Sequence, residues 1–135
     1  MTLANTDKIL VITSASTGNN VFCTPAIRFL RKHLPNATID VVALNKLSAE
    51  VFAGNPDINE VFVINSARAF DKKAKDYTKV IALNKNALKK LSGLTTPLMT
   101  VPVLRADAHH ADQLLAFVAS LVGAESSESD RQYVI

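Results

Sequence analysis

Hydrophobic positions along the chain gather in short runs that are separated by polar or amphipathic segments. β-Branched and apolar runs of this length are typical of buried strands in a parallel sheet. The last run contains Pro102, which fits a strand only at a sheet edge or a bulge. The pattern predicts five strands, at Lys8–Ser14, Thr38–Leu44, Glu60–Ile64, Thr78–Leu83 and Leu98–Leu104.

A helical segment is expected after each of these runs. After the first run, Thr24 suits an N-cap and Pro25 suits the first helical position, so a helix is predicted from there to Leu34. Residues 15–22 are then expected to form a loop of small residues. The other predicted helices are a short one capped by Ser48, then Ala67–Asp76, Ala87–Leu91, and one that runs from Asp107 or His109 to Val122 before Gly123.

Strands that alternate with helices in this way predict an α/β fold, with a doubly wound, mostly parallel five-stranded sheet of Rossmann-like type. We expect the strand order 3-2-1-4-5, with the first strand central because Ile9–Ile12 is apolar on both faces. The predicted lobe spans residues 8–123. Residues 1–7 are expected to be an N-terminal extension, and residues 124–135 a flexible acidic linker or tail.

Composition narrows the class of protein. Hydrophobic residues make up 48% and charged residues 20% of the chain, which is an ordinary globular balance. A single Cys excludes an intramolecular disulfide and a cysteine-based zinc site, and the absence of Trp argues against nucleic acid as a partner. No apolar run approaches the length needed to span a bilayer, and no targeting segment is visible. We expect a cytoplasmic protein without a transmembrane segment.

Charge is distributed unevenly along the chain. The segment between Ser66 and Ser92 contains eight Lys or Arg residues and only two Asp. Residues 124–135 contain three acidic residues and one Arg. A basic middle favours an anionic ligand or surface in that region. The alternative interpretation is a solvated, lysine-rich helix face.

Candidate chemistry lies where two predicted strands end, because ligands of such sheets bind beyond the carboxyl ends of the strands. Small residues and a helix start let backbone amides approach an anion after the first strand, and side-chain amides can bind sugar hydroxyls or phosphate. Local turn hydrogen bonds are the alternative role of those amides. The candidate binding residues are Ser16, Thr17, Gly18, Asn19, Asn20, Asn84, Lys85 and Asn86.

Other reactive residues carry weaker signals. His109 and His110 are adjacent rather than four residues apart, so no metal site is expected there. Cys23 stands at the start of the predicted helix, where it is either an activated thiol or a small buried residue. Spacing supports no Ser-His-Asp or Cys-His catalytic set.

Several blocks resemble glycosyltransferase family 9, the lipopolysaccharide heptosyltransferases. The pattern K-I-L-V-I-x-S-x-S-x-G-x-x-V-F-x-T-P-A-I-R-x-L-R at Lys8–Arg31 resembles the opening of that family. P-N-A-T-I-D-V-V-A at Pro35–Ala43, A-G-N-P-D-I-N-E-V-F at Ala53–Phe62 and Y-T-K-V-I-A-L at Tyr77–Leu83 are similar to its next strands. His109–Gly123 resembles the helix that closes its N-terminal lobe.

The resemblance implies one of two Rossmann-like lobes with the active site between them. In the family, the N-terminal lobe receives a growing lipopolysaccharide core, and the second lobe holds a nucleotide-sugar donor of the ADP-heptose type. Transfer inverts the anomeric centre without an obligatory metal or other cofactor. A carboxylate directly after the loop glycine is the proposed general base, and Asn19 stands at that position here. An amide can orient an acceptor hydroxyl but cannot deprotonate it.

Two functional interpretations follow. In the first, the chain is the acceptor-side lobe of a heptosyltransferase-like enzyme in lipopolysaccharide core or related glycan assembly. It would be inactive alone, because it ends at Ile135 where the donor lobe should begin. Its expected partners are a glycan or lipopolysaccharide-core acceptor and either a second lobe or another copy of the same chain. Peripheral association with the inner membrane is also expected. In the second, it is a non-catalytic module that binds an anionic glycan or a partner protein.

Overall fold

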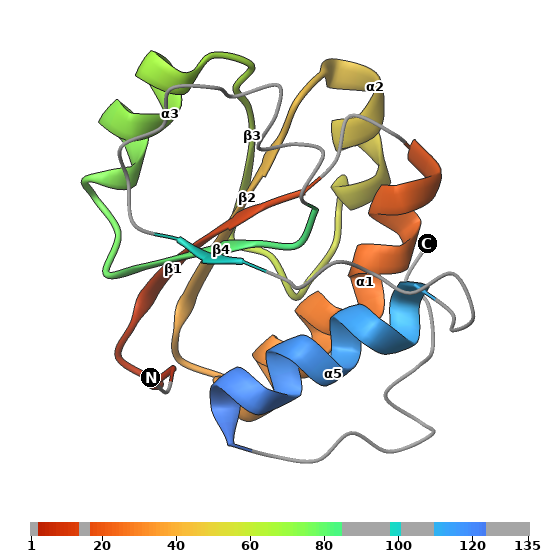
Figure 1. Ribbon diagram of the computed structural model, residues 1–135, viewed down its shortest axis with the longest axis vertical. Coiled ribbons are helices and arrows are strands. Elements are labelled where there is room, and N and C mark those ends of the chain that lie inside the picture. The colour runs from red at the N-terminus through yellow and green to blue at the C-terminus, as the bar shows by residue number, and fades with distance from the viewer. Residues whose placement is uncertain (1–2, 14–16, 85–97, 101–109, 124–135) are drawn as a thin grey trace.

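The computed structural model describes residues 3–13, 17–84, 98–100 and 110–123. Its centre is a parallel sheet in the order β3-β2-β1-β4-β5, with helices on both faces (Figure 1). The predicted α/β fold and strand order are confirmed. The strands are β1 (Lys8–Ile12), β2 (Thr38–Ala43), β3 (Glu60–Val63), β4 (Lys79–Ala82) and β5 (Met99–Thr100).

Two helical layers cover the sheet. On one face, α1 and α5 pack against each other and against Ile9 and Val11 of β1. On the other face, Phe70 and Ala74 of α3 lie in the cluster formed by Leu10 and Ile12. The helices are α1 (Thr17–His33), α2 (Lys46–Ala49), the 3-10 helix η1 (Glu50–Phe52), α3 (Ala67–Ala74) and α5 (His110–Val122).

The central position of β1 follows from its side chains. Ile9–Ile12 has no exposed surface, and alternate residues belong to the two opposite core clusters. A strand that is apolar on both faces is stabilised only where helices cover both faces, which is the middle of a doubly wound sheet. The apolar run in the sequence therefore predicted the position correctly.

The start of α1 differs from the prediction. The loop expected at residues 15–22 is wrong from Thr17 onward, and so is the cap at Thr24, because one helix runs through Thr17–His33 with Pro25 inside it. Proline lacks the N–H that would bond the carbonyl four residues earlier. The Thr24 hydroxyl donates to that carbonyl, on Val21, over 2.8 Å. This substitute hydrogen bond lets the helix pass through the proline.

Smaller differences concern the other helices. Ser48 does not cap α2; Asn45 does, because its Oδ1 accepts the Ser48 N–H over 2.8 Å. Ser66 caps α3, which ends at Ala74 rather than Asp76. Gly123 has a φ of +70°, the left-handed conformation that ends a helix. The expected helix at 87–91, residues 101–104 of the fifth strand and the start of the last helix at 107–109 lie outside the described residues.

Polar contacts join the segments at the amino-terminal edge of the sheet. Leu3 is buried, and its N–H donates to the Leu121 carbonyl at the end of α5. Asp7 accepts hydrogen bonds from the Ala4 N–H and the Thr78 hydroxyl, and its Oδ1 lies 3.3 Å from Lys79 Nζ. Burial opposes ionisation of Asp7, but these hydrogen bonds and the Lys79 charge outweigh it and lower its pKa.

The same edge holds a buried carboxylate. Asp40 of β2 accepts a 2.6 Å hydrogen bond from the Tyr77 hydroxyl and a 3.1 Å bond from the Glu60 N–H. Burial and the neighbouring Asp40 raise the pKa of Tyr77, so this hydroxyl keeps its proton and remains a donor. The contact ties the segment before β4 to β2.

Arg31 joins three segments through its guanidinium. It lies in the last turn of α1, is half-buried and donates to five acceptors. These are the carbonyls of Leu34 (3.2 Å), Pro35 (3.1 Å), Ala37 (2.7 Å) and Asp57 (3.1 Å), and Asn59 Oδ1 (2.7 Å).

Candidate functional site

The carboxyl ends of β1, β2 and β4 meet at one edge of the sheet. Directly after β1, Thr13 donates to the Val42 carbonyl with its N–H (2.9 Å) and its hydroxyl (3.0 Å). Leu83, directly after β4, donates its N–H to the Ile12 carbonyl over 3.0 Å. These bonds fix the strand ends beside one another, where the fold class predicts a ligand site.

Helix α1 begins at this edge. Thr17, Gly18 and Asn19 belong to its first turn, so three residues expected in a loop lie at the start of a helix. First-turn N–H groups have no intrahelical acceptor, and the helix dipole adds partial positive charge there. Such a terminus attracts anions, and its first turn contains no acidic residue that would oppose them. Ser16 lies outside the described residues.

Asn20 is the candidate residue whose contacts are best defined. Its side chain has no exposed surface, and its Nδ2 donates a 2.9 Å hydrogen bond to the Ser48 carbonyl of α2. Asn84 is half-buried and directly follows Leu83 at the end of β4. Lys85 and Asn86 lie outside the described residues. Asn20 and Asn84 thus belong to the segments that follow β1 and β4. Contact of the candidate binding residues with a substrate stays a prediction.

Cys23 is a core residue rather than an activated thiol. It lies inside α1, not at its start, and 1% of its surface is exposed. Burial raises its pKa to about 12. A protonated, covered thiol is a poor nucleophile, so the small buried residue is the correct interpretation.

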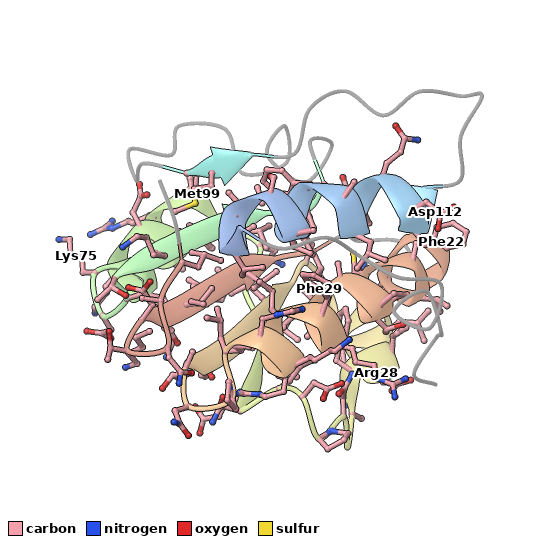
Figure 2. The ribbon with its side chains drawn as sticks, turned by 90° about the horizontal axis from the view of Figure 1, so that it is seen from below. Phe22, Arg28, Phe29, Lys75, Met99 and Asp112 are labelled. Atoms are coloured by element: carbon pink, nitrogen blue, oxygen red, sulfur yellow. The ribbon has the colours of Figure 1, made fainter. Side chains whose placement is uncertain are left out.

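Basic residues gather on α3 and at its C-cap. Arg68, Lys72 and Lys75 are exposed, whereas the Lys73 Nζ lies 3.8 Å from the centroid of the Phe62 ring. Figure 2 shows Lys75 and Phe22, a residue in the first half of α1, at opposite ends of the molecule. Lys75, the C-cap residue of α3, therefore lies far from the first half of α1.

Within the described segments, no group of three or more His, Cys, Asp or Glu residues is arranged to hold a metal ion. No helix there has the length and apolar character required to cross a bilayer.

Comparison with known proteins shows the fold. No family model and no curated protein matches the chain. Among solved structures, a family 9 glycosyltransferase from Veillonella parvula aligns with 100% of this chain at 22% identity and a TM-score of 0.72. An Escherichia coli heptosyltransferase solved with ADP aligns with 90% of it at 13% identity and 0.70. The E. coli ADP-heptose lipopolysaccharide heptosyltransferase II aligns with 82% at 20% identity and 0.62.

The length of the aligned part is as informative as its fold. The chain spans 47% of the Veillonella protein, 48% of the first E. coli enzyme and 40% of the second. The neighbours therefore contain about as much structure again outside the aligned region. The chain has the α/β fold that occupies about half of these glycosyltransferase structures, as its resemblance to family 9 implied.

Proposed function

We propose that this chain is the acceptor-side lobe of a heptosyltransferase-like, inverting glycosyltransferase in lipopolysaccharide core or related glycan assembly. The observation that carries the proposal is the fold that this chain shares with a family 9 structure. The family-like motif of the chain lies at the start of α1 within that fold. That helix start faces the sheet edge at which α/β folds bind ligands.

The proposed site combines a helix start with side-chain amides. The first turn of α1 supplies N–H donors for a phosphate or sugar carboxylate, and Lys85 supplies a cation. Asn84 and Asn86 would bind acceptor hydroxyls together with Ser16, Thr17 and Gly18, whereas the fully buried side chain of Asn20 would not reach the acceptor. Asn19 would orient the reacting hydroxyl without taking its proton. The donor, an ADP-heptose-type nucleotide sugar, would be held by a second lobe.

The cellular setting belongs to the same proposal. Nucleotide-sugar donors are cytoplasmic, so we place the chain in the cytoplasm. A lipopolysaccharide core grows on a membrane anchor, which would bring the protein to the inner-membrane surface peripherally. The required partner is a second lobe, with another copy of this chain as the alternative.

A second candidate function rests on α3. Arg68 and Lys72 of α3 and its C-cap residue Lys75 form an exposed cationic surface, whose Lys75 end lies far from the first half of α1. This surface supports a non-catalytic module that binds an anionic glycan or partner protein. The two functions differ in what they require, because transfer needs the carboxyl edge and a donor lobe, whereas binding through α3 needs neither.

A transfer assay tests the proposed function. We expect the 135-residue chain to transfer no sugar from ADP-heptose to a lipopolysaccharide-core acceptor above background. A separately expressed donor lobe of a family 9 enzyme should be equally inactive, and mixing the two should produce measurable transfer. The control is the donor lobe mixed with an unrelated Rossmann-like domain. Turnover by the chain alone, or a mixture no more active than this control, would contradict the proposal.

A further inference from the structure

Helix α2 is held at the carboxyl edge by two sets of polar contacts. The first is internal: Asn45 Oδ1 accepts the Ser48 N–H, and the Ser48 hydroxyl donates to the Asn45 carbonyl over 3.1 Å. The second comes from another element, because Asn20 Nδ2 donates to the Ser48 carbonyl. Ser48 thus joins α2 to the first turns of α1.

The attachment is fully buried. The side chains of Asn20 and Ser48 have no exposed surface, and a buried polar group without a partner is costly. A hydrogen bond from an amide N–H is directional, so this contact requires the Ser48 carbonyl to lie in line with the Asn20 amide. The contact therefore fixes the position of α2 relative to α1. With four residues, α2 has little stability of its own, so it depends on such contacts.

We propose that Asn20 is a positioning residue, whose amide holds α2 against α1 and thereby makes Lys46 and the β2–α2 connection one wall of the acceptor site. Lys46 is the first residue of α2, is exposed, and follows the cap residue Asn45 at the end of β2. It would bring a cation to the side of the site opposite Asn84. This inference rests on the proposed function. It means that Asn20 affects acceptor binding indirectly, by holding α2 in place.

The test compares Asn20→Leu with Tyr77→Phe. Leucine has nearly the shape of asparagine without its donor, and Tyr77→Phe removes one side-chain hydrogen bond at the opposite edge of the sheet. The probe is a phosphorylated heptose added to 15N-labelled chain. We expect Asn20→Leu to weaken binding about tenfold, the equivalent of one hydrogen bond, and Tyr77→Phe to leave it unchanged. Amide exchange in Lys46–Ala49 should accelerate in Asn20→Leu alone.

Each outcome separates this inference from the proposed function. Equal weakening by both variants would show a general stability effect and overturn the positioning role. Unchanged binding by Asn20→Leu would also overturn the positioning role. In that case, ligand-induced shifts at Thr17–Gly18 would still support the proposed acceptor site. If Asn20→Leu does not fold, the test uses the unsubstituted chain. The positioning role then requires that the amide signals of Lys46–Ala49 shift when the ligand is added, and it is overturned if they do not. No shift anywhere would remove the acceptor site, and this inference with it.

Discussion

Replacing Arg31 by alanine should destabilise the chain more than any other single change at an incompletely buried position. The substitution removes all five hydrogen bonds of the guanidinium, which tie the end of α1 to the turn before β2 and to the approach to β3. Hydrogen bonds from charged donors are worth more than neutral ones, so we expect a loss of about 3 kcal/mol or more in the free energy of unfolding.

The measurement is urea unfolding with Arg28→Ala as the matched control. Arg28 lies on the same helix but is exposed (Figure 2), so its loss should change stability by less than about 0.5 kcal/mol. Arg31→Lys keeps the charge but lacks the planar fork, and should fall between the two. An Arg31→Ala variant as stable as Arg28→Ala would show that the five contacts contribute no net stability.

Restoring a carboxylate at residue 19 should produce the largest change in activity. In the mixture with a donor lobe, Asn19→Asp should raise the transfer rate by roughly 10²- to 10⁴-fold, the usual contribution of general acid–base catalysis. The physical reason is that an aspartate can accept the proton of the acceptor hydroxyl, whereas an amide cannot. Transfer is measured as ADP release at saturating donor, with and without acceptor.

The control for this change is Asn36→Asp, which introduces the same charge at an exposed position in the turn before β2. It should leave the transfer rate as it is. If the unaltered mixture were fully active and Asn19→Asp added nothing, residue 19 would not be the position of the general base. A rise of equal size in Asn36→Asp would assign the effect to net charge.

The sheet could be predicted from the sequence, because its signal is local. Four consecutive residues of β1 that are apolar on both faces can lie only between two helical layers, and the remaining runs follow in order. The start of α1 could not be predicted in the same way. Thr24-Pro25 is typical of a helix start, but α1 continues through Pro25, and the Thr24 hydroxyl donates to the Val21 carbonyl that the proline cannot bond.

Long-range polar contacts explain what the sequence missed at Arg31 and Asn20. A cation on the polar side of a helix is expected in solvent, but the acceptors of Arg31 reach as far as Asn59. Asn20 was expected to bind substrate, yet its amide donates to a residue 28 positions away. Arg31 also joins three of the motif blocks, since it ends the first block and contacts residues of the second and third.

Amide chemical-shift mapping of the 15N-labelled chain with a phosphorylated core sugar tests the location of the acceptor site most directly. We expect shifts to cluster on Gly18–Asn20 and Asn84–Asn86, with an affinity on the order of millimolar when these 135 residues are titrated without a donor lobe. Binding should weaken as salt is added, since salt screens the attraction between an anionic ligand and the site. Shifts that cluster instead on Arg68–Lys75, with Gly18–Asn20 silent, would place binding on α3 and contradict the account.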